Sequence, residues 1–335
     1  MKCLPFFIAL AALCSYSVNA EETRLNEYSG SEIEAPYWFK DSFLDLSDDI
    51  QEAQDEGKKL LIYYHQAGCP YCYNLVQQSF LDPAFSQYIQ DNFDLVALDL
   101  WGDREVTLPD GTALTEKELA IKWKIQYTPT LLFYSESETP VLRIDGYRSP
   151  EMLAKIMDYV VTGNTEISLA QKMIQQDQSK VLYPSELLLP ANQFKGDRGV
   201  QPVALLFEYP GCEDCVQLHK KVLSRSDTHQ LMQGFKTYRF DVSYSEKIDI
   251  GAAGQKTAAA YAEELGLTYF PSIVLLDTEG AEQLRIDGYV QSFHFNTALE
   301  YVSEKAYQRV PEFQRYINER ADRLREEGQE VVITQ

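Results

Sequence analysis

The residues of this sequence with the clearest chemical capability are four cysteines, which form two Cys-x-x-Cys pairs. The first pair is Cys69 and Cys72, and the second is Cys212 and Cys215. At the start of a helix, this spacing brings both sulfurs within bonding distance, and the helix N-terminus stabilises a thiolate. The first thiolate of such a pair attacks a partner disulfide, and the second cysteine resolves the mixed disulfide. We therefore expect two catalytic, redox-active disulfides, in which Cys69 and Cys212 attack.

Two other uses of these cysteines stay open. A zinc site made from both pairs is disfavoured, because the offset of 143 residues between matching cysteines far exceeds the spacing of a zinc ribbon. Purely structural disulfides would not need the proline that follows each pair, Pro129 and Pro271. We expect no metal and no other cofactor.

The chain contains two copies of one unit. Both cysteine pairs and the segments around them recur at an offset of 142 or 143 residues. The matching segments are 61–64 with 204–207, 127–130 with 269–272, and 142–147 with 284–289. A repeat of this length indicates two domains of ordinary size, which also suits a chain of 335 residues.

The apolar patterns predict the same elements in each copy. A strand precedes the cysteine pair, the pair opens a helix, and a second helix follows. Another strand, a helix, the proline, two strands and a final helix complete the copy. The expected strands are 60–64, 94–100 and 130–134, with 203–207, 236–242 and 272–276 in the second copy, and each copy adds one through its Arg-Ile-Asp-Gly segment. The expected helices are 71–80, one after Asp82, 115–123 and 150–161, with 214–223, one after Ser226, 257–265 and 293–307. The predicted fold class is α/β, with a central mixed sheet flanked by helices in each domain.

The strand, the Cys-x-x-Cys helix and the later proline together resemble the thioredoxin superfamily. In that family the proline is cis and packs against the cysteine pair, and the backbone before it binds an extended substrate peptide. The resemblance assigns substrate binding to Thr128 and Pro129 in the first copy, and to Phe270 and Pro271 in the second.

The first copy is further similar to the SoxW-type periplasmic thioredoxins. The likeness rests on Trp38-Phe39-Lys40, Gly68-Cys69-Pro70-Tyr71-Cys72, the segment 101–107 and Thr128-Pro129-Thr130. It implies a bacterial periplasmic setting, whereas a role in sulfur metabolism rests on analogy alone. The second copy lacks the Trp-Gly-Asp-Arg segment.

One departure from ordinary thioredoxins concerns proton transfer. That family has a buried Asp six residues before the first cysteine, where this chain has Tyr63 and Leu206. Glu208 and His65, each four residues before a first cysteine, are the alternative proton carriers. We favour the simpler interpretation that they are strand-end residues facing solvent or the other domain.

The N-terminus predicts export. Lys2 is the only charge in the first twenty residues, an apolar run follows, and Val18-Asn19-Ala20 is a typical cleavage site. The expected organisation is a signal peptide at 1–20, a flexible segment at 21–35, domains at 36–162 and 181–307 with a helical linker at 163–180, and a charged helical tail at 308–335. We expect a periplasmic protein without stable membrane insertion.

The net charge of −21 disfavours nucleic acid as a partner. The expected partners are protein or small-molecule disulfides and thiols, together with an unidentified redox donor. A reductase, a disulfide isomerase and a non-enzymatic binder with structural disulfides are the three functions that the sequence leaves open, and we favour the reductase.

The dipeptides inside the two pairs predict unequal redox potentials. Pro70-Tyr71 is of the glutaredoxin type, for which potentials lie at about −200 to −230 mV, whereas Glu213-Asp214 places two acids beside the second site. Like charge disfavours the thiolate and hence the dithiol form. Redox titration of both pairs should find Cys212–Cys215 at the lower potential, and the reverse order would refute this interpretation.

Overall fold

The computed structural model describes residues 35–135, 137–163, 181–196, 199–251, 254–329 and 331. The expected signal peptide, nearly all of the N-terminal segment and the linker between the domains lie outside the described residues. Among those residues, no helix is long and apolar enough to cross a membrane.

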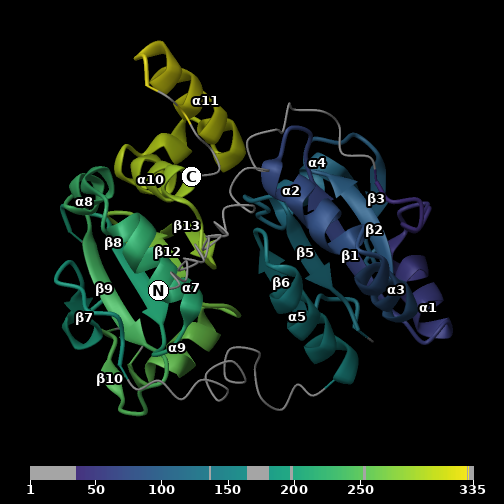
Figure 1. The fold of residues 1–335 in the computed structure, drawn as a ribbon, viewed down its shortest axis with the longest axis horizontal. Coiled ribbons are helices and arrows are strands. Elements are labelled where there is room, and N and C mark those ends of the chain that lie inside the picture. Colours follow the sequence, from purple (N-terminus) through teal and green to yellow (C-terminus); the bar gives the residue numbers. More distant parts are fainter. Residues whose placement is uncertain are drawn as a thin grey trace, which may run out of the picture.

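The first domain is built on a four-stranded mixed sheet, in the order β2-β1-β5-β6 (Figure 1). Strand β1 pairs in parallel with β2 and antiparallel with β5, and β5 pairs antiparallel with β6. The strands are β1 (Lys59–His65), β2 (Phe93–Asp99), β5 (Thr130–Phe133) and β6 (Leu142–Asp145). Alternate residues of β1 enter two different cores, because successive side chains of a strand point to opposite faces.

Helices cover both faces of this sheet. The active-site helix α2 (Pro70–Leu75) continues as a π-helical turn over Val76–Phe80, and α3 (Pro83–Asn92) and α5 (Pro150–Thr162) lie on the same face. The opposite face carries α1 (Leu46–Asp55) and α4 (Glu116–Lys122). A hairpin of β3 (Glu105–Thr107) and β4 (Ala113–Thr115) precedes α4. Helix α1 and this hairpin are additions to the elements predicted from the sequence.

The second domain repeats the arrangement with one more strand, in the order β13-β12-β8-β9-β7. Its strands are β7 (Leu189–Pro190), β8 (Val203–Glu208), β9 (Lys236–Asp241), β12 (Ser272–Leu276) and β13 (Glu282–Asp287), with a small hairpin of β10 (Ile248–Asp249) and β11 (Gln255–Lys256). Its helices are α7 (Glu213–Gln217), which continues as a π-helical turn over Leu218–Leu223, α8 (Ser226–Met232), α9 (Ala258–Glu264) and α10 (Ser292–Ser303), with short 3₁₀ turns at Ala191–Gln193 and Ala306–Gln308. Two mixed sheets flanked by helices confirm the predicted fold class.

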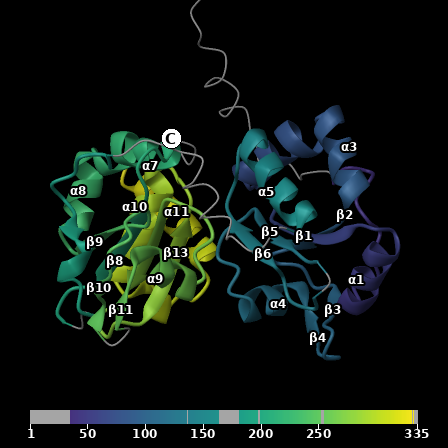
Figure 2. The same cartoon turned by 90° about the horizontal axis from the view of Figure 1, so that it is seen from below.

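The two domains lie side by side, and their edge strands β6 and β13 contact each other (Figures 1 and 2). The C-terminal helix α11 (Phe313–Glu326) is an integral part of the fold. Its Phe313 is fully buried and packs on Tyr127 of the first domain, with ring centroids 5.4 Å apart. Tyr127 thereby joins the core of the second domain. Helix α11 connects the domains because its apolar face is shared between them.

Replacing Phe313 by alanine should lower the free energy of unfolding by about 3–5 kcal/mol, since the ring leaves a cavity against Tyr127 and Tyr301. Phe43 is fully exposed, so Phe43→Ala is the matched control, with an expected change within about 0.5 kcal/mol. Urea denaturation of both variants measures the difference. Equal stabilities would contradict the packing described for α11.

Candidate active site

The first cysteine pair forms a disulfide at the N-terminus of α2. Cys69 is the N-cap residue, and its Sγ accepts a hydrogen bond from the Cys72 backbone N–H at 3.0 Å. Pro70 occupies the first helical turn, where its missing N–H costs nothing. The helix therefore directs free backbone N–H groups at the sulfur that would become the attacking thiolate.

The loop before β5 lies against this disulfide. The Thr128–Pro129 peptide bond is cis, and the Thr128 carbonyl oxygen is 3.4 Å from Cys69 Sγ. The Thr128 hydroxyl also donates a hydrogen bond to Cys69 Sγ, at 3.4 Å. The structure thus brings Cys69, Cys72, Thr128 and Pro129 together at one site, and Thr128 provides a side-chain donor to the sulfur.

The second disulfide, Cys212–Cys215, repeats this geometry at the N-terminus of α7. Cys212 is the N-cap, and its Sγ accepts a hydrogen bond from the Cys215 N–H at 3.0 Å. The Phe270–Pro271 bond is also cis, with the Phe270 carbonyl oxygen 3.8 Å from Cys212 Sγ. Phe270 has no hydroxyl, so the sulfur at this site lacks the side-chain donor that Thr128 provides at the first.

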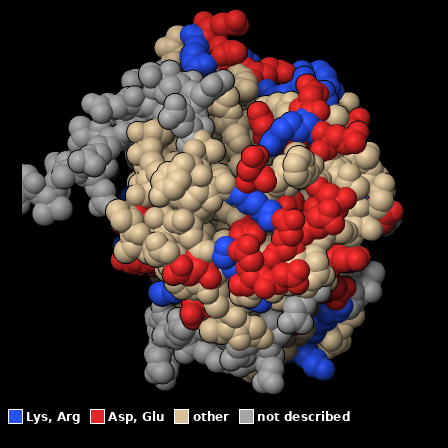
Figure 3. Space-filling view, turned by 90° about the vertical axis from the view of Figure 1, so that its right-hand side faces the viewer, with Lys and Arg blue, Asp and Glu red and all other residues tan. Residues whose placement is uncertain are grey.

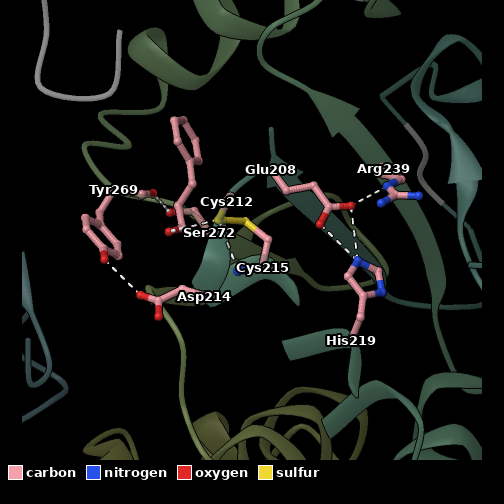
Figure 4. The surroundings of a disulfide bond; sticks show 9 residues. Glu208, Cys212, Asp214, Cys215, His219, Arg239, Tyr269 and Ser272 are labelled. Atoms are coloured by element: carbon pink, nitrogen blue, oxygen red, sulfur yellow. Dashed lines mark hydrogen bonds and ion pairs between the residues drawn. A yellow bond between two sulfur atoms is a disulfide. The ribbon is translucent and has the colours of Figure 1, made fainter. Parts of the chain in front are cut away.

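The two acidic residues inside the second cysteine pair, Glu213 and Asp214, lie in different environments. Glu213 is exposed, whereas Asp214 accepts a hydrogen bond from the Tyr269 hydroxyl at 2.8 Å (Figure 4). Burial raises the pKa of Tyr269, and the Asp214 carboxylate raises it further, so the phenol stays protonated as a donor. Tyr269 directly precedes the Phe270–Pro271 bond and links the proline loop to the cysteine helix.

The surroundings of Glu208 contradict the interpretation that it is a strand-end residue facing solvent. It is only 1% exposed, and His219 Nε2 lies 2.9 Å from its carboxylate. Arg239 donates a second, very short hydrogen bond to the same carboxylate. Figure 4 shows the Glu208 carboxylate directed at His219 and Arg239 rather than at the disulfide. Glu208, His219 and Arg239 form this ion cluster on the face of β8 that also carries Leu206. The proton-carrier role of Glu208 stays a prediction.

The corresponding residue of the first domain behaves differently. His65 is partly buried, and burial lowers its pKa below the usual value, so the ring is neutral near pH 7. Its ring packs on Tyr63, with centroids 5.4 Å apart. A neutral imidazole can accept a proton, so the proton-carrier role of His65 stays a prediction.

Sequence reasoning missed Arg148, which lies at the boundary of the domains. Its guanidinium stacks over the Tyr269 ring at 4.1 Å from the centroid, and Nη2 donates to the Asp287 carbonyl oxygen at 2.8 Å. No motif marks Arg148, because its partners belong to the other copy and only the domain arrangement brings them together.

No three His, Cys, Asp or Glu side chains lie together among the described residues as a metal site would require. The two cysteine pairs lie in separate domains. Each pair forms an internal disulfide.

A mixed sheet, a Cys-x-x-Cys pair whose first cysteine caps a helix and an adjoining cis-proline loop together define a thioredoxin-like thiol:disulfide oxidoreductase. A model of the thioredoxin-like domain matches residues 46–161 and 195–303, more than half of the chain. The chain therefore belongs to the thioredoxin-like domain family. That family is broader than the SoxW-type proteins, so the finer resemblance of the first copy stays a prediction.

Each of the similar solved structures covers about one domain of this chain. A thioredoxin-fold protein from Helicobacter pylori is 20% identical, with 41% of this chain and 96% of that chain covered at a TM-score of 0.35. A thioredoxin from Thermus thermophilus is 22% identical, with 36% and 87% covered at 0.29. The C-terminal domain of DsbD from Neisseria meningitidis is 20% identical, with 30% and 81% covered at 0.24. A search of curated proteins by sequence found no match.

Asp287, at the end of β13, should titrate abnormally. Burial raises its pKa to about 6, and the nearby Asp145 carboxylate adds to the effect. Because the native state holds this proton more tightly than the unfolded chain, the stabilisation is complete below about pH 4. It is lost as pH rises through about 6, by an amount on the order of 3 kcal/mol.

Carboxyl NMR titration should find this group at about 6. Asp287→Asn keeps the oxygen that accepts the Ser272 hydroxyl at 2.8 Å, and it should remove this part of the pH dependence of unfolding. A midpoint near 4 for Asp287 would contradict the assigned burial.

Proposed function

We propose that this chain is an exported reductase of disulfides, with both cysteine pairs catalytic. The observation that carries the proposal is the N-cap position of Cys69 and Cys212, each with a backbone N–H on its sulfur. That geometry stabilises the thiolate released on reduction, which makes it a good attacking group. A merely structural disulfide gains nothing from a place at a helix N-terminus.

The proline loops are the proposed substrate-binding elements. The backbone of Thr128 and Phe270 would pair with an extended peptide whose disulfide lies over Cys69 or Cys212, with Pro129 and Pro271 fixing the loop. The close approach of both carbonyl oxygens to the first cysteines supports this proposal. The first site is the proposed substrate-facing one, because its sequence matches the SoxW-type resemblance.

The proposed location is the periplasm. The signal-like N-terminus supports it, and disulfide exchange has its substrates in oxidising compartments. Figure 3 views the first domain from the side of α1 and shows a broad band of Asp and Glu side chains. Such a surface repels phosphate-rich partners and admits neutral or basic ones. The proposed partners are disulfide-containing proteins or small molecules and one donor of electrons.

Reduction of insulin with a supplied dithiol tests this proposal. Cys69→Ser should lower the rate at least tenfold, because the remaining cysteine of the pair cannot replace the attacking sulfur. Cys212→Ser should also reduce it. Refolding of scrambled ribonuclease is the parallel assay, and higher activity there would favour an isomerase.

The control for this test is Tyr73→Phe, which changes an exposed residue of α2 without touching either sulfur. Unchanged rates for both cysteine variants in both assays would leave only a binding protein with structural disulfides.

A further inference from the structure

Helix α11 is an addition to the second thioredoxin-like unit. It follows residues 195–303, the part of the second domain that the thioredoxin-like model matches. Phe313 and Tyr316 of α11 lie in the core of the second domain, and Arg320 donates a hydrogen bond to Glu300 of α10 at 2.6 Å. Helix α11 is therefore fixed to the second domain, although it lies outside the repeated unit.

The N-terminal end of α11 lies against the first cysteine site. Gln314 is only 9% exposed, and its Nε2 donates a hydrogen bond to the Gln126 carbonyl oxygen at 2.9 Å. Gln126 lies two residues before Thr128, in the loop that is proposed to bind substrate. The Gln314 Oε1 accepts a hydrogen bond from Gln66 Nε2 at 2.8 Å, and Gln66 lies three residues before Cys69. One side-chain amide of the second domain thus links the two segments that lead to the first site.

The direction of these hydrogen bonds is fixed at both ends. Trp101 Nε1–H can only donate, and it donates to Gln66 Oε1 at 2.8 Å. The Gln126 carbonyl oxygen, at the other end, can only accept. Gln66 and Gln314 must therefore each direct the amide oxygen toward Trp101 and the amide nitrogen toward the loop. The Arg315 guanidinium also lies over the Trp101 ring, 5.0 Å from its centroid, so α11 contacts the Trp-Gly-Asp-Arg segment that the second copy lacks.

Helices α10 and α11 also contact the aromatic residues of the first site. Tyr71, inside the first Cys-x-x-Cys, packs edge-on against His294 of α10, with ring centroids 5.4 Å apart. Tyr127, directly before Thr128, packs on Phe313 of α11. The end of β1, the cysteine helix and the proline loop of the first site are thus each in contact with α10 or α11.

Gln314 makes the kind of contact that a bound peptide would make. A side-chain amide has the same N–H donor and carbonyl acceptor as a peptide bond. An extended substrate pairs its main chain with the proline loop, and Gln314 already donates to a main-chain carbonyl of that loop.

From these contacts we propose that α10 and α11 form an autoinhibitory cap over the first cysteine pair, in which Gln314 imitates a substrate amide. The inference rests on the proposed reductase function and adds how access to the substrate-facing site is controlled. Cys69 is 5% exposed and Thr128 is 7% exposed in the capped arrangement. An attacking sulfur must touch its partner disulfide, so a protein disulfide reacts only after the cap has moved away.

The capped arrangement contains groups that favour its opening. The Tyr71 hydroxyl and His294 Nδ1 are buried, and neither has a hydrogen-bond partner within the described part of the chain. An unpaired buried polar group is unfavourable, and water can satisfy both groups once the cap has moved. The capped and open arrangements therefore exchange, and the apparent affinity for substrate is reduced by the fraction of chains that are open.

Reduction of insulin by the full chain, with insulin varied at saturating dithiol, tests the cap. Gln314→Ala should lower the KM for insulin about fivefold and leave kcat unchanged, since lost hydrogen bonds to the loop increase the open fraction. A variant that is only destabilised would lose activity, so a gain separates the cap from a structural role. Trp101→Phe removes the donor to Gln66 but keeps a ring under Arg315, and it should lower the KM in the same direction.

The matched control is Arg325→Ala, which changes an exposed residue of α11 whose side chain pairs with Asp322 of the same helix. Its KM should equal that of the wild type. An unchanged or higher KM in Gln314→Ala, with wild-type turnover still dependent on Cys69, would overturn the cap alone. Equal turnover by the wild type and Cys69→Ser would instead overturn the proposed function.

A second measurement tests the cap without turnover. The fully reduced chain is alkylated with a maleimide that carries a long polymer, or with N-ethylmaleimide, and the rate at Cys69 is followed by peptide mass spectrometry. The ratio of the bulky to the small reagent's rate should rise about fivefold in Gln314→Ala, because only open chains admit the polymer. It should stay the same in Arg325→Ala. An unchanged ratio in Gln314→Ala would overturn the cap, whether or not the chain reduces insulin.

Discussion

The structure depends first on one contact, the backbone N–H of the second cysteine donating to the sulfur of the first. It occurs twice, at Cys69 and at Cys212, each time at 3.0 Å. The contact requires that a helix begin at the first cysteine, and β1 and β8 deliver the chain to that point from the centre of each sheet. The proline loops then approach the same sulfurs from the neighbouring strands β5 and β12. Sheet, helix and loop are thus arranged around the position of one atom in each domain.

The two copies of the domain differ at residues that lie near their cysteine pairs. Thr128 becomes Phe270, Tyr71 becomes Asp214, and His65 becomes Glu208 with its own buried ion cluster. The framework around these positions is retained, including the Arg-Ile-Asp-Gly segments that end β6 and β13. Different residues beside the cysteines, within the same fold, are what would be needed if the two cysteine pairs carry out different redox reactions.

Much of the fold of each domain could be predicted from the sequence, because the apolar patterns and motifs that indicate its elements are local. The apolar runs of β1 and β8, the helix after each cysteine pair and the repeat itself are visible as patterns. The position of each cysteine pair at the start of a helix was predicted from the sequence, whereas the N-cap role of Cys69 and Cys212 comes from the structure. Helix α1 and the β3–β4 hairpin were missed, since short or amphipathic elements give weak patterns.

The relations between distant residues could not be predicted. Glu208 looked like a strand end facing solvent, but His219 and Arg239 come from two other elements and bury it. Arg148 has no motif, and its role depends on Tyr269 in the other copy. The charged helix α11 looked like a tail because its polar face dominates its composition, whereas Phe313 fixes it to Tyr127.

The central claim is that reduction of the two disulfides leaves both first cysteines as thiolates stabilised by a helix N-terminus, more strongly at Cys69 than at Cys212. The pH dependence of alkylation of the fully reduced chain, read separately for Cys69 and Cys212 by mass spectrometry, tests it most directly. The account predicts that Cys69 reacts with a midpoint well below the value of about 8.5 for free cysteine, and below that of Cys212. Midpoints at or above 8.5 for both cysteines would contradict it.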